Sequence, residues 1–170
     1  WQNMSTEVVV NPLRDLGDLN DLPWPAYEHF PMHRYQDRFC NLPTPMVNLL
    51  SSRGCPFGCT FCLWPKVMYN GHKYRTRANK DIVSEIEYLV KTYSFKSVYF
   101  DDDTFNIGKK RLLDLASKLR ERDMQIPLAC MARADTMDED ILVALKDAGL
   151  YAVKYGVESG DQQVLNICGK

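Results

Sequence analysis

The chain has 170 residues, which is enough for one domain and too few for two of ordinary size. Hydrophobic residues make up 45% of it and charged residues 25%, so a predominantly disordered protein is excluded. The net charge of −1 argues against a nucleic-acid-binding protein, and neither an export signal nor an apolar run of membrane-spanning length is present. We therefore expect a soluble, cytoplasmic protein.

The first segment, residues 1–45, is rich in proline. Residues 11–45 hold six of the nine prolines, which excludes a regular helix or a central strand. We interpret residues 1–45 as an extended connector from an upstream domain, and we expect its aromatic side chains to pack onto the protein body. These are Trp24, Tyr27, Phe30, Tyr35 and Phe39. Because the chain starts at Trp1 rather than at methionine, we expect it to be a piece of a longer protein.

From Met46 onward, short apolar runs alternate with amphipathic helices. The expected strands are Met46–Leu50, Ser97–Phe100, Ile126–Ala132 and Tyr151–Val157. The expected helices are Asn79–Tyr93, one after Gly108 that carries Leu112 to Leu119, one that a capping box at Thr136–Glu139 opens and Gly149 ends, and Asp161–Cys168. This alternation predicts an α/β fold with parallel strands: four βα units of a partial TIM-like barrel, with the fourth strand as an open edge.

Polar groups follow every expected strand. A cysteine triplet follows the first strand, Asp101–Asp103 the second, Arg133 with Asp135 the third, and Glu158 with Ser159 the fourth. Since the carboxyl ends of parallel strands meet at one edge, these groups are expected to face one mouth.

The cysteine triplet is the most specific of these signals. Cys55, Cys59 and Cys62 have the spacing CxxxCxxC in a loop that also contains Pro56 and Gly58. Three thiolates suit a cubane iron–sulfur cluster and leave its fourth iron open. The alternative is structural zinc, which requires four ligands, so that Cys40 or His72 would complete the site.

Several longer strings accompany the triplet. They are RGCPFGCTFC with Phe61 before the last cysteine, HKYRTR, YFDDDTFN, MARADT and KYGVESGDQ. Together they resemble the radical S-adenosylmethionine (radical SAM) enzymes, in particular their cobalamin-dependent branch, over residues 12–168. The resemblance identifies residues 46–170 as the N-terminal part of a radical SAM core.

The resemblance also implies site roles. Cys55, Cys59 and Cys62 would ligate a 4Fe–4S cluster whose open iron chelates S-adenosylmethionine, and one-electron reduction would release a 5′-deoxyadenosyl radical. The expected contacts of S-adenosylmethionine are Asp102 or Asp103 to its ammonium, Arg133 to its carboxylate, Glu158 with Ser159 to its ribose, and Phe61 near its adenine.

The reaction expected from the resemblance is cobalamin-dependent methyl transfer, or radical cyclisation or rearrangement, on an unknown small molecule. An electron donor such as flavodoxin or ferredoxin would be the partner. The Asp-x-His-x-x-Gly string that ligates cobalamin is absent from this sequence, so an upstream domain would hold that cofactor. Three alternatives stay open: a zinc-stabilised binding module, a tRNA-modifying, methylthiotransferase-like enzyme, and a non-catalytic scaffold.

Overall fold

A four-stranded parallel sheet forms the centre of the protein. The computed structural model describes residues 10–34 and 40–170. The strands lie in the order β1 (Met46–Leu49), β4 (Ser97–Phe100), β5 (Leu128–Ala132) and β6 (Leu150–Tyr155). Each pairs in parallel with its neighbour, so the predicted α/β fold is confirmed and a partial TIM-like barrel is consistent with it.

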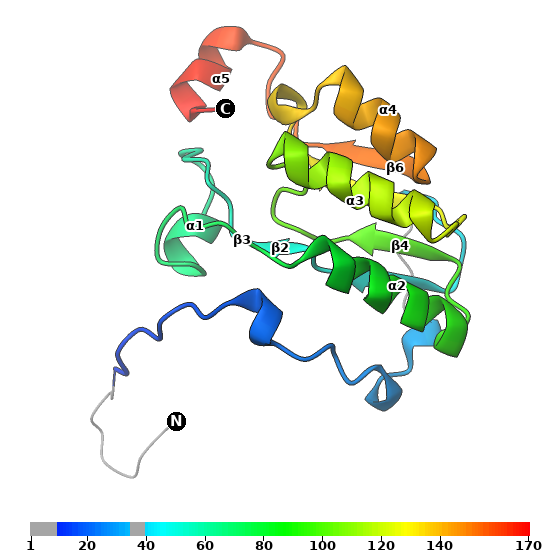
Figure 1. Ribbon diagram of the computed structural model, residues 1–170. Helices are drawn as coiled ribbons and strands as arrows, with labels where there is room; N and C mark the ends of the chain where they lie inside the picture. The colour runs from blue at the N-terminus through cyan, green and yellow to red at the C-terminus, as the bar shows by residue number, and fades with distance from the viewer. Residues whose placement is uncertain (1–9, 35–39) are drawn as a thin grey trace.

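Three amphipathic helices cover one face of this sheet. They are α2 (Asn79–Tyr93), α3 (Lys109–Glu121) and α4 (Glu139–Asp147), which lie side by side in Figure 1. The two shorter helices, α1 (Trp64–Val67) and α5 (Gln162–Cys168), lie at the end of the sheet where the strands finish. Among the helices of the described residues, none is both long and apolar enough to cross a membrane.

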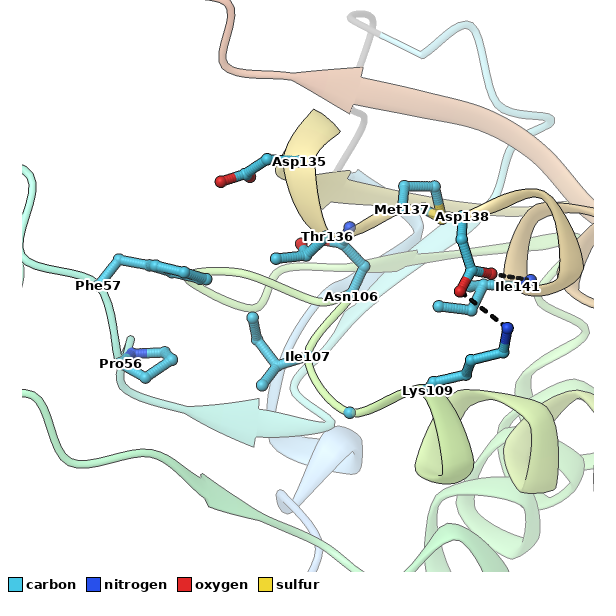
Figure 2. A pocket seen from close by; sticks show the side chains of 11 residues that line it. Pro56, Phe57, Asn106, Ile107, Lys109, Asp135, Thr136, Met137, Asp138 and Ile141 are labelled. Atoms are coloured by element: carbon cyan, nitrogen blue, oxygen red, sulfur yellow. Dashed lines mark hydrogen bonds and ion pairs between the residues drawn. The ribbon is translucent and has the colours of Figure 1, made fainter. Parts of the chain in front are cut away.

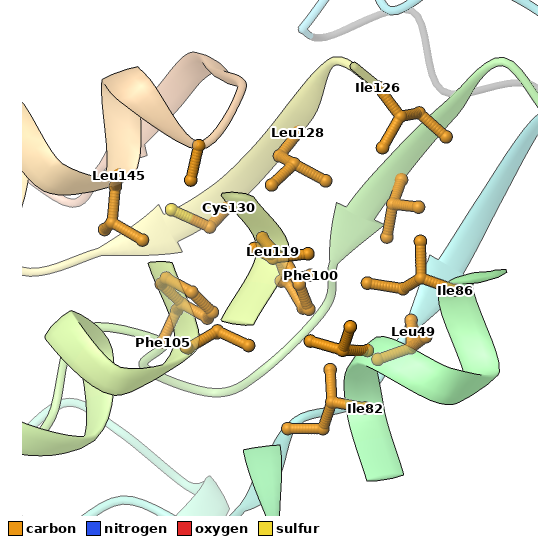
Figure 3. Close-up of a cluster of buried hydrophobic side chains, with 14 of the residues drawn as sticks. Leu49, Ile82, Ile86, Phe100, Phe105, Leu119, Ile126, Leu128, Cys130 and Leu145 are labelled. Atoms are coloured by element: carbon orange, nitrogen blue, oxygen red, sulfur yellow. The ribbon is translucent and has the colours of Figure 1, made fainter. Parts of the chain in front are cut away.

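The core lies between the sheet and these helices. Figure 3 shows side chains of the strands meeting those of α2, α3 and α4, including fully buried Phe100, Ile82 and Leu119. Residues at helical spacing point inward from α2, which explains why the sequence pattern located this helix at its observed bounds. Burying such side chains supplies about 1.5–3 kcal/mol each before entropy is subtracted.

One helix start differs from the expected one. The sequence predicts a capping box at Thr136–Glu139, but Thr136 lies in a 3₁₀ turn (Ala134–Thr136) and Asp138 is the N-cap of α4. The Asp138 carboxylate accepts a hydrogen bond from the amide of Ile141 at 2.9 Å. The carboxylate two residues later accepts from a free amide of the first helical turn and also favours the helix dipole, so the helix begins after Asp138 rather than after Thr136.

The connector is built of short turns that pack against α2. Its 3₁₀ turns are Leu19–Asp21, Tyr27–His29 and Met32–Arg34. The Trp24 ring contacts Tyr88, and its indole donates a hydrogen bond to Asp81 at 2.9 Å. Tyr35 and Phe39 lie outside the described residues.

A buried ion pair anchors the connector. The Tyr27 hydroxyl donates to Glu85 at 2.7 Å, and the guanidinium of Arg77 lies 2.6 Å from the other oxygen of the same carboxylate. The Glu85 side chain is only 1% exposed, so its charge depends on Arg77 for compensation. Arg77 also donates to the Leu50 carbonyl, which ties this anchor to the end of β1.

We predict that Arg77→Ala lowers the free energy of unfolding by about 3–5 kcal/mol, because Glu85 then stays buried without a countercharge. Tyr27→Phe removes one hydrogen bond and is expected to cost about 1 kcal/mol. Urea denaturation measures both values. Exposed Arg120→Ala is the control, and equal losses for Arg77→Ala and Arg120→Ala would contradict the anchoring role.

Candidate functional site

The three cysteines share one cavity with the ends of all four parallel strands. The cavity has a volume of about 420 Å³. Its lining residues are Leu50, Cys55, Cys59, Phe61, Cys62, Trp64, Tyr69, Asp101, Asp102, Asp103, Thr104, Met131, Ala132, Arg133, Gly156, Glu158 and Lys170. The predicted convergence of the strand ends on one mouth is therefore observed in the structure.

Gly54 fixes the start of the cysteine loop, residues 54–63. It follows β2 (Ser52–Arg53), which pairs with β3 (Arg75–Thr76) in a small antiparallel ribbon that the sequence analysis did not predict. Gly54 has a φ of +92°, and a Cβ there would lie 1.9 Å from the Lys73 carbonyl oxygen. Only glycine fits this position, since both the backbone conformation and the space exclude a side chain.

The acidic run after β4 divides into three different environments. Asp101 is exposed at the cavity. Asp102 is 2% exposed and accepts hydrogen bonds from the Ser51 and Ser52 hydroxyls at 2.9 and 2.6 Å and from the Ser52 amide. Asp103 accepts from the Gly54 amide at 2.9 Å. Burial raises the pKa of Asp102 to about 6, although its hydrogen bonds act in the opposite direction.

Arg133 lies against the cysteine loop. Its guanidinium makes two hydrogen bonds to Asp135, at 2.9 and 2.6 Å, and a third to the Cys59 sulfur at 3.1 Å. The group also stacks on the Phe57 ring, 3.8 Å from its centroid. The hydrogen bonds from Arg133 lower the pKa of Asp135 and keep this carboxylate ionised. A positive group thus lies at the cysteine side of the cavity.

The residues after β6 also reach the cysteine loop, because the Cys168 carbonyl accepts a hydrogen bond from the Thr60 amide at 2.9 Å. Glu158 is exposed, lines the cavity and accepts from the Lys170 ammonium at 3.1 Å. Its φ of 64° is a left-handed conformation that costs free energy for a non-glycine residue, and such strain concentrates at functional sites. Ser159 is absent from the cavity lining, and its hydroxyl accepts from the Asp161 amide at the start of α5.

Tyr69 belongs to the site but was not predicted. Burial, reinforced by a hydrogen bond to Asp103, raises its pKa to about 12, so the phenol stays protonated at neutral pH. Tyr69 and Trp64 line the cavity from a segment without a periodic pattern, and Lys170 reaches it from beyond α5. No local sequence signal marks these three residues.

The donor chemistry of the cavity fits an iron–sulfur cluster. Three cysteines without disulfide bonds line it, and thiolates are the ligands such a cluster takes. In the part of the chain that the structure describes, no three His, Cys, Asp or Glu side chains are already gathered as a metal-ligand set. Neither Cys40 nor His72, the expected fourth zinc ligands, lines this cavity.

A second cavity of about 370 Å³ adjoins the cysteine loop. In Figure 2, Pro56 and Phe57 of that loop face Ile107 and Thr136 across it, while Lys109 reaches Asp138 at its far side. Phe57 lines this cavity and Arg133 the first one, so the stacked pair separates them.

Comparisons with known proteins agree with this geometry. The sequence model of the radical SAM superfamily matches residues 49–170 of this chain. The chain is 29% identical over 155 residues to the uncharacterized methyltransferase PH0819 of Pyrococcus horikoshii, covering 91% of this chain and 32% of that protein. It is 30% identical over 165 residues to the anaerobic magnesium-protoporphyrin IX monomethyl ester cyclase of Rubrivivax gelatinosus, covering 94% of this chain and 27% of the cyclase.

A solved structure is also similar. The cobalamin-dependent S-adenosylmethionine radical enzyme OxsB, with aqua-cobalamin and S-adenosylmethionine bound, superposes with a TM-score of 0.58 and 25% identity. The match covers 72% of this chain and 20% of OxsB. The chain thus spans about a third of the length of PH0819 and less of the other two proteins.

We predict that Gly54→Ala lowers the free energy of unfolding by about 1–3 kcal/mol, because alanine is strained at this φ and meets the Lys73 carbonyl. Gly160→Ala is the matched control, since nothing lies within 4 Å of a Cβ at Gly160. Urea denaturation of both variants is the measurement. A Gly54→Ala protein as stable as Gly160→Ala would show that the loop start is not constrained.

Proposed function

The chain belongs to the radical SAM superfamily, and from this premise we propose that it binds a 4Fe–4S cluster and S-adenosylmethionine as the N-terminal part of a catalytic core. When bound, the reduced cluster would supply one electron that breaks the sulfonium C–S bond of S-adenosylmethionine and yields methionine and a 5′-deoxyadenosyl radical. The observation that carries the proposal is the single cavity shared by Cys55, Cys59, Cys62 and the four strand ends. The three thiols would hold three irons of the cluster.

We assign the ammonium group of S-adenosylmethionine to Asp101. The family resemblance implies Asp102 or Asp103 in this role, but both carboxylates are already engaged. Asp102 is buried and accepts from Ser52, and Asp103 accepts from the Gly54 amide. Asp101 is the exposed carboxylate of the run and lines the cavity. The Asp101 carboxylate could therefore accept a charge-assisted hydrogen bond from an ammonium group bound in the cavity.

The other proposed contacts of S-adenosylmethionine are assigned from where each side chain lies in or beside the cavity. Arg133 would exchange part of its bidentate pairing with Asp135 for the methionine carboxylate, since a guanidinium recognises either carboxylate with the same geometry. Glu158 would accept hydrogen bonds from the ribose hydroxyls, with Ser159 next to it. Phe61 is half exposed at the cavity and would cover the adenine.

The reaction that we propose is cobalamin-dependent methyl transfer to a small molecule. The names of PH0819 and OxsB support it, because the first is a methyltransferase and the second is cobalamin-dependent. Radical cyclisation is the second candidate, supported by the name of the Rubrivivax cyclase. Cobalamin would be held by residues outside this chain, and a flavodoxin or ferredoxin would deliver the electron.

Anaerobic reconstitution is expected to load about four iron and about four sulfide per chain, the content of one cubane cluster. Cys59→Ala is expected to abolish this content, because it removes one of three ligands, whereas Cys130→Ala, a buried β5 cysteine outside the cavity, keeps it. Iron and acid-labile sulfide analysis is the measurement. Zinc near one per chain without sulfide would instead support the zinc-stabilised module.

Asp101→Asn is expected to weaken binding of S-adenosylmethionine to the reconstituted chain about tenfold or more, the loss typical of one charge-assisted hydrogen bond. The measurement is the change in the low-temperature EPR spectrum of the reduced cluster as S-adenosylmethionine is titrated. Exposed Asp147→Asn is the control. A larger loss for Asp102→Asn than for Asp101→Asn would return the ammonium contact to Asp102.

A further inference from the structure

The turn after β4 and the start of the cysteine loop run side by side in matched order. Asp102 contacts Ser52, Asp103 contacts Gly54, and the Thr104 hydroxyl lies 3.5 Å from the Cys55 sulfur. Successive residues of the turn thus meet successive parts of the loop. Three successive residues of the turn after β4 each contact the segment that leads into the cysteine loop, so the two segments are aligned rather than touching at a single point.

The innermost contact is wholly enclosed. Asp102 is 2% exposed, and its partners Ser51 and Ser52 are fully buried. Both carboxylate oxygens are engaged, one by the Ser51 hydroxyl and the other by the hydroxyl and amide of Ser52. Arg111 donates to the Ser51 hydroxyl at 3.3 Å and so brings a positive charge close to the buried Asp102 carboxylate. Desolvating a carboxylate is costly, so a buried one that bonds to a single short segment fixes that segment in place.

The outer contact acts on the residue before the first cysteine. The Asp103 carboxylate accepts a hydrogen bond from the Gly54 amide. On the other side of Gly54, the Lys73 carbonyl occupies the space that a Cβ would need. Gly54 is therefore held from two directions, and Cys55 begins the loop from a fixed point. Without these bonds the loop would start from the two-residue strand β2 alone.

We propose that Asp102 and Asp103 are positioning residues that hold the cysteine loop in the conformation that presents its thiols to one cluster. The inference rests on the proposed function for the cluster itself. It gives the acidic run two roles, in which Asp101 faces the ligand and Asp102 with Asp103 orders the protein's own metal-binding loop. Preorganising ligands through residues behind them is a general requirement of metal sites.

The first test uses the full chain before any iron is added. Amide hydrogen exchange at Ser52 is expected to become about tenfold faster in Asp102→Ala, and exchange at Gly54 about tenfold faster in Asp103→Ala, as the loss of one ordinary hydrogen bond predicts. Asp102→Asn keeps an acceptor for the Ser52 amide and is expected to retain protection. Asp147→Ala is the control. Unchanged exchange in both alanine variants would overturn the proposal.

The second test loads the same proteins with iron and sulfide under anaerobic conditions. Both alanine variants are expected to hold less than about half of the wild-type cluster, or to give an altered EPR spectrum, with recovery in Asp102→Asn. Wild-type content and spectrum in both alanine variants would overturn the proposal. If wild type itself takes up no cluster, the proposed function fails, while the exchange experiment still decides whether the two aspartates hold the loop. Should Asp102→Ala not fold, Asp103→Ala and Asp102→Asn carry both tests.

Discussion

The direction of the strands is the constraint on which the site depends. In a parallel sheet every strand ends at the same edge, so the four segments that follow β1, β4, β5 and β6 must meet there. The three long helices pack on one face and bury the apolar side of the sheet without entering this edge. The edge carries the polar and sulfur-bearing side chains together with apolar Leu50, Phe61 and Trp64, and the cavity forms between them.

Within that cavity, charge is distributed by depth. Asp102 is buried and bonds to protein groups, whereas Asp101 and Glu158 reach the open space. Arg133 is 5% exposed and supplies the opposite charge beside Cys59. The cavity therefore presents both signs of charge, as the proposed zwitterionic ligand with its ammonium and carboxylate would require. The same division explains why three neighbouring aspartates need not share one task.

The sequence predicted those parts of the fold that a periodic pattern encodes. The α2 helix has its predicted bounds because Ile82, Ile86 and Leu89 repeat at helical spacing, and each strand was found within two residues of its position. The predicted start of α4 was wrong, since two polar residues two positions apart, Thr136 and Asp138, could each cap the helix. The β2–β3 ribbon was missed because four residues are too few to show alternation.

For the site, the cysteine spacing was informative because all three cysteines lie in one short loop and line the same cavity. The different environments of Asp101, Asp102 and Asp103 were not predictable from the sequence, because they depend on which carboxylate the fold buries. Tyr69 and Lys170 likewise reach the cavity only through tertiary contacts. Local pattern therefore located residues that line the cavity, while burial set the environment of each neighbour.

The described part of the connector runs along one side of the sheet. The Gly17 carbonyl accepts a hydrogen bond from Arg75 of β3, and the Asn20 side chain accepts one from the amide of Ala78, so these residues lie against the ribbon next to Gly54. Residues 10–16 thus lead into the β1 side of the sheet and away from the β6 edge. The side of the sheet on which the connector lies is therefore set by its hydrogen bonds to the β3 segment, although the connector's own sequence has no periodic pattern.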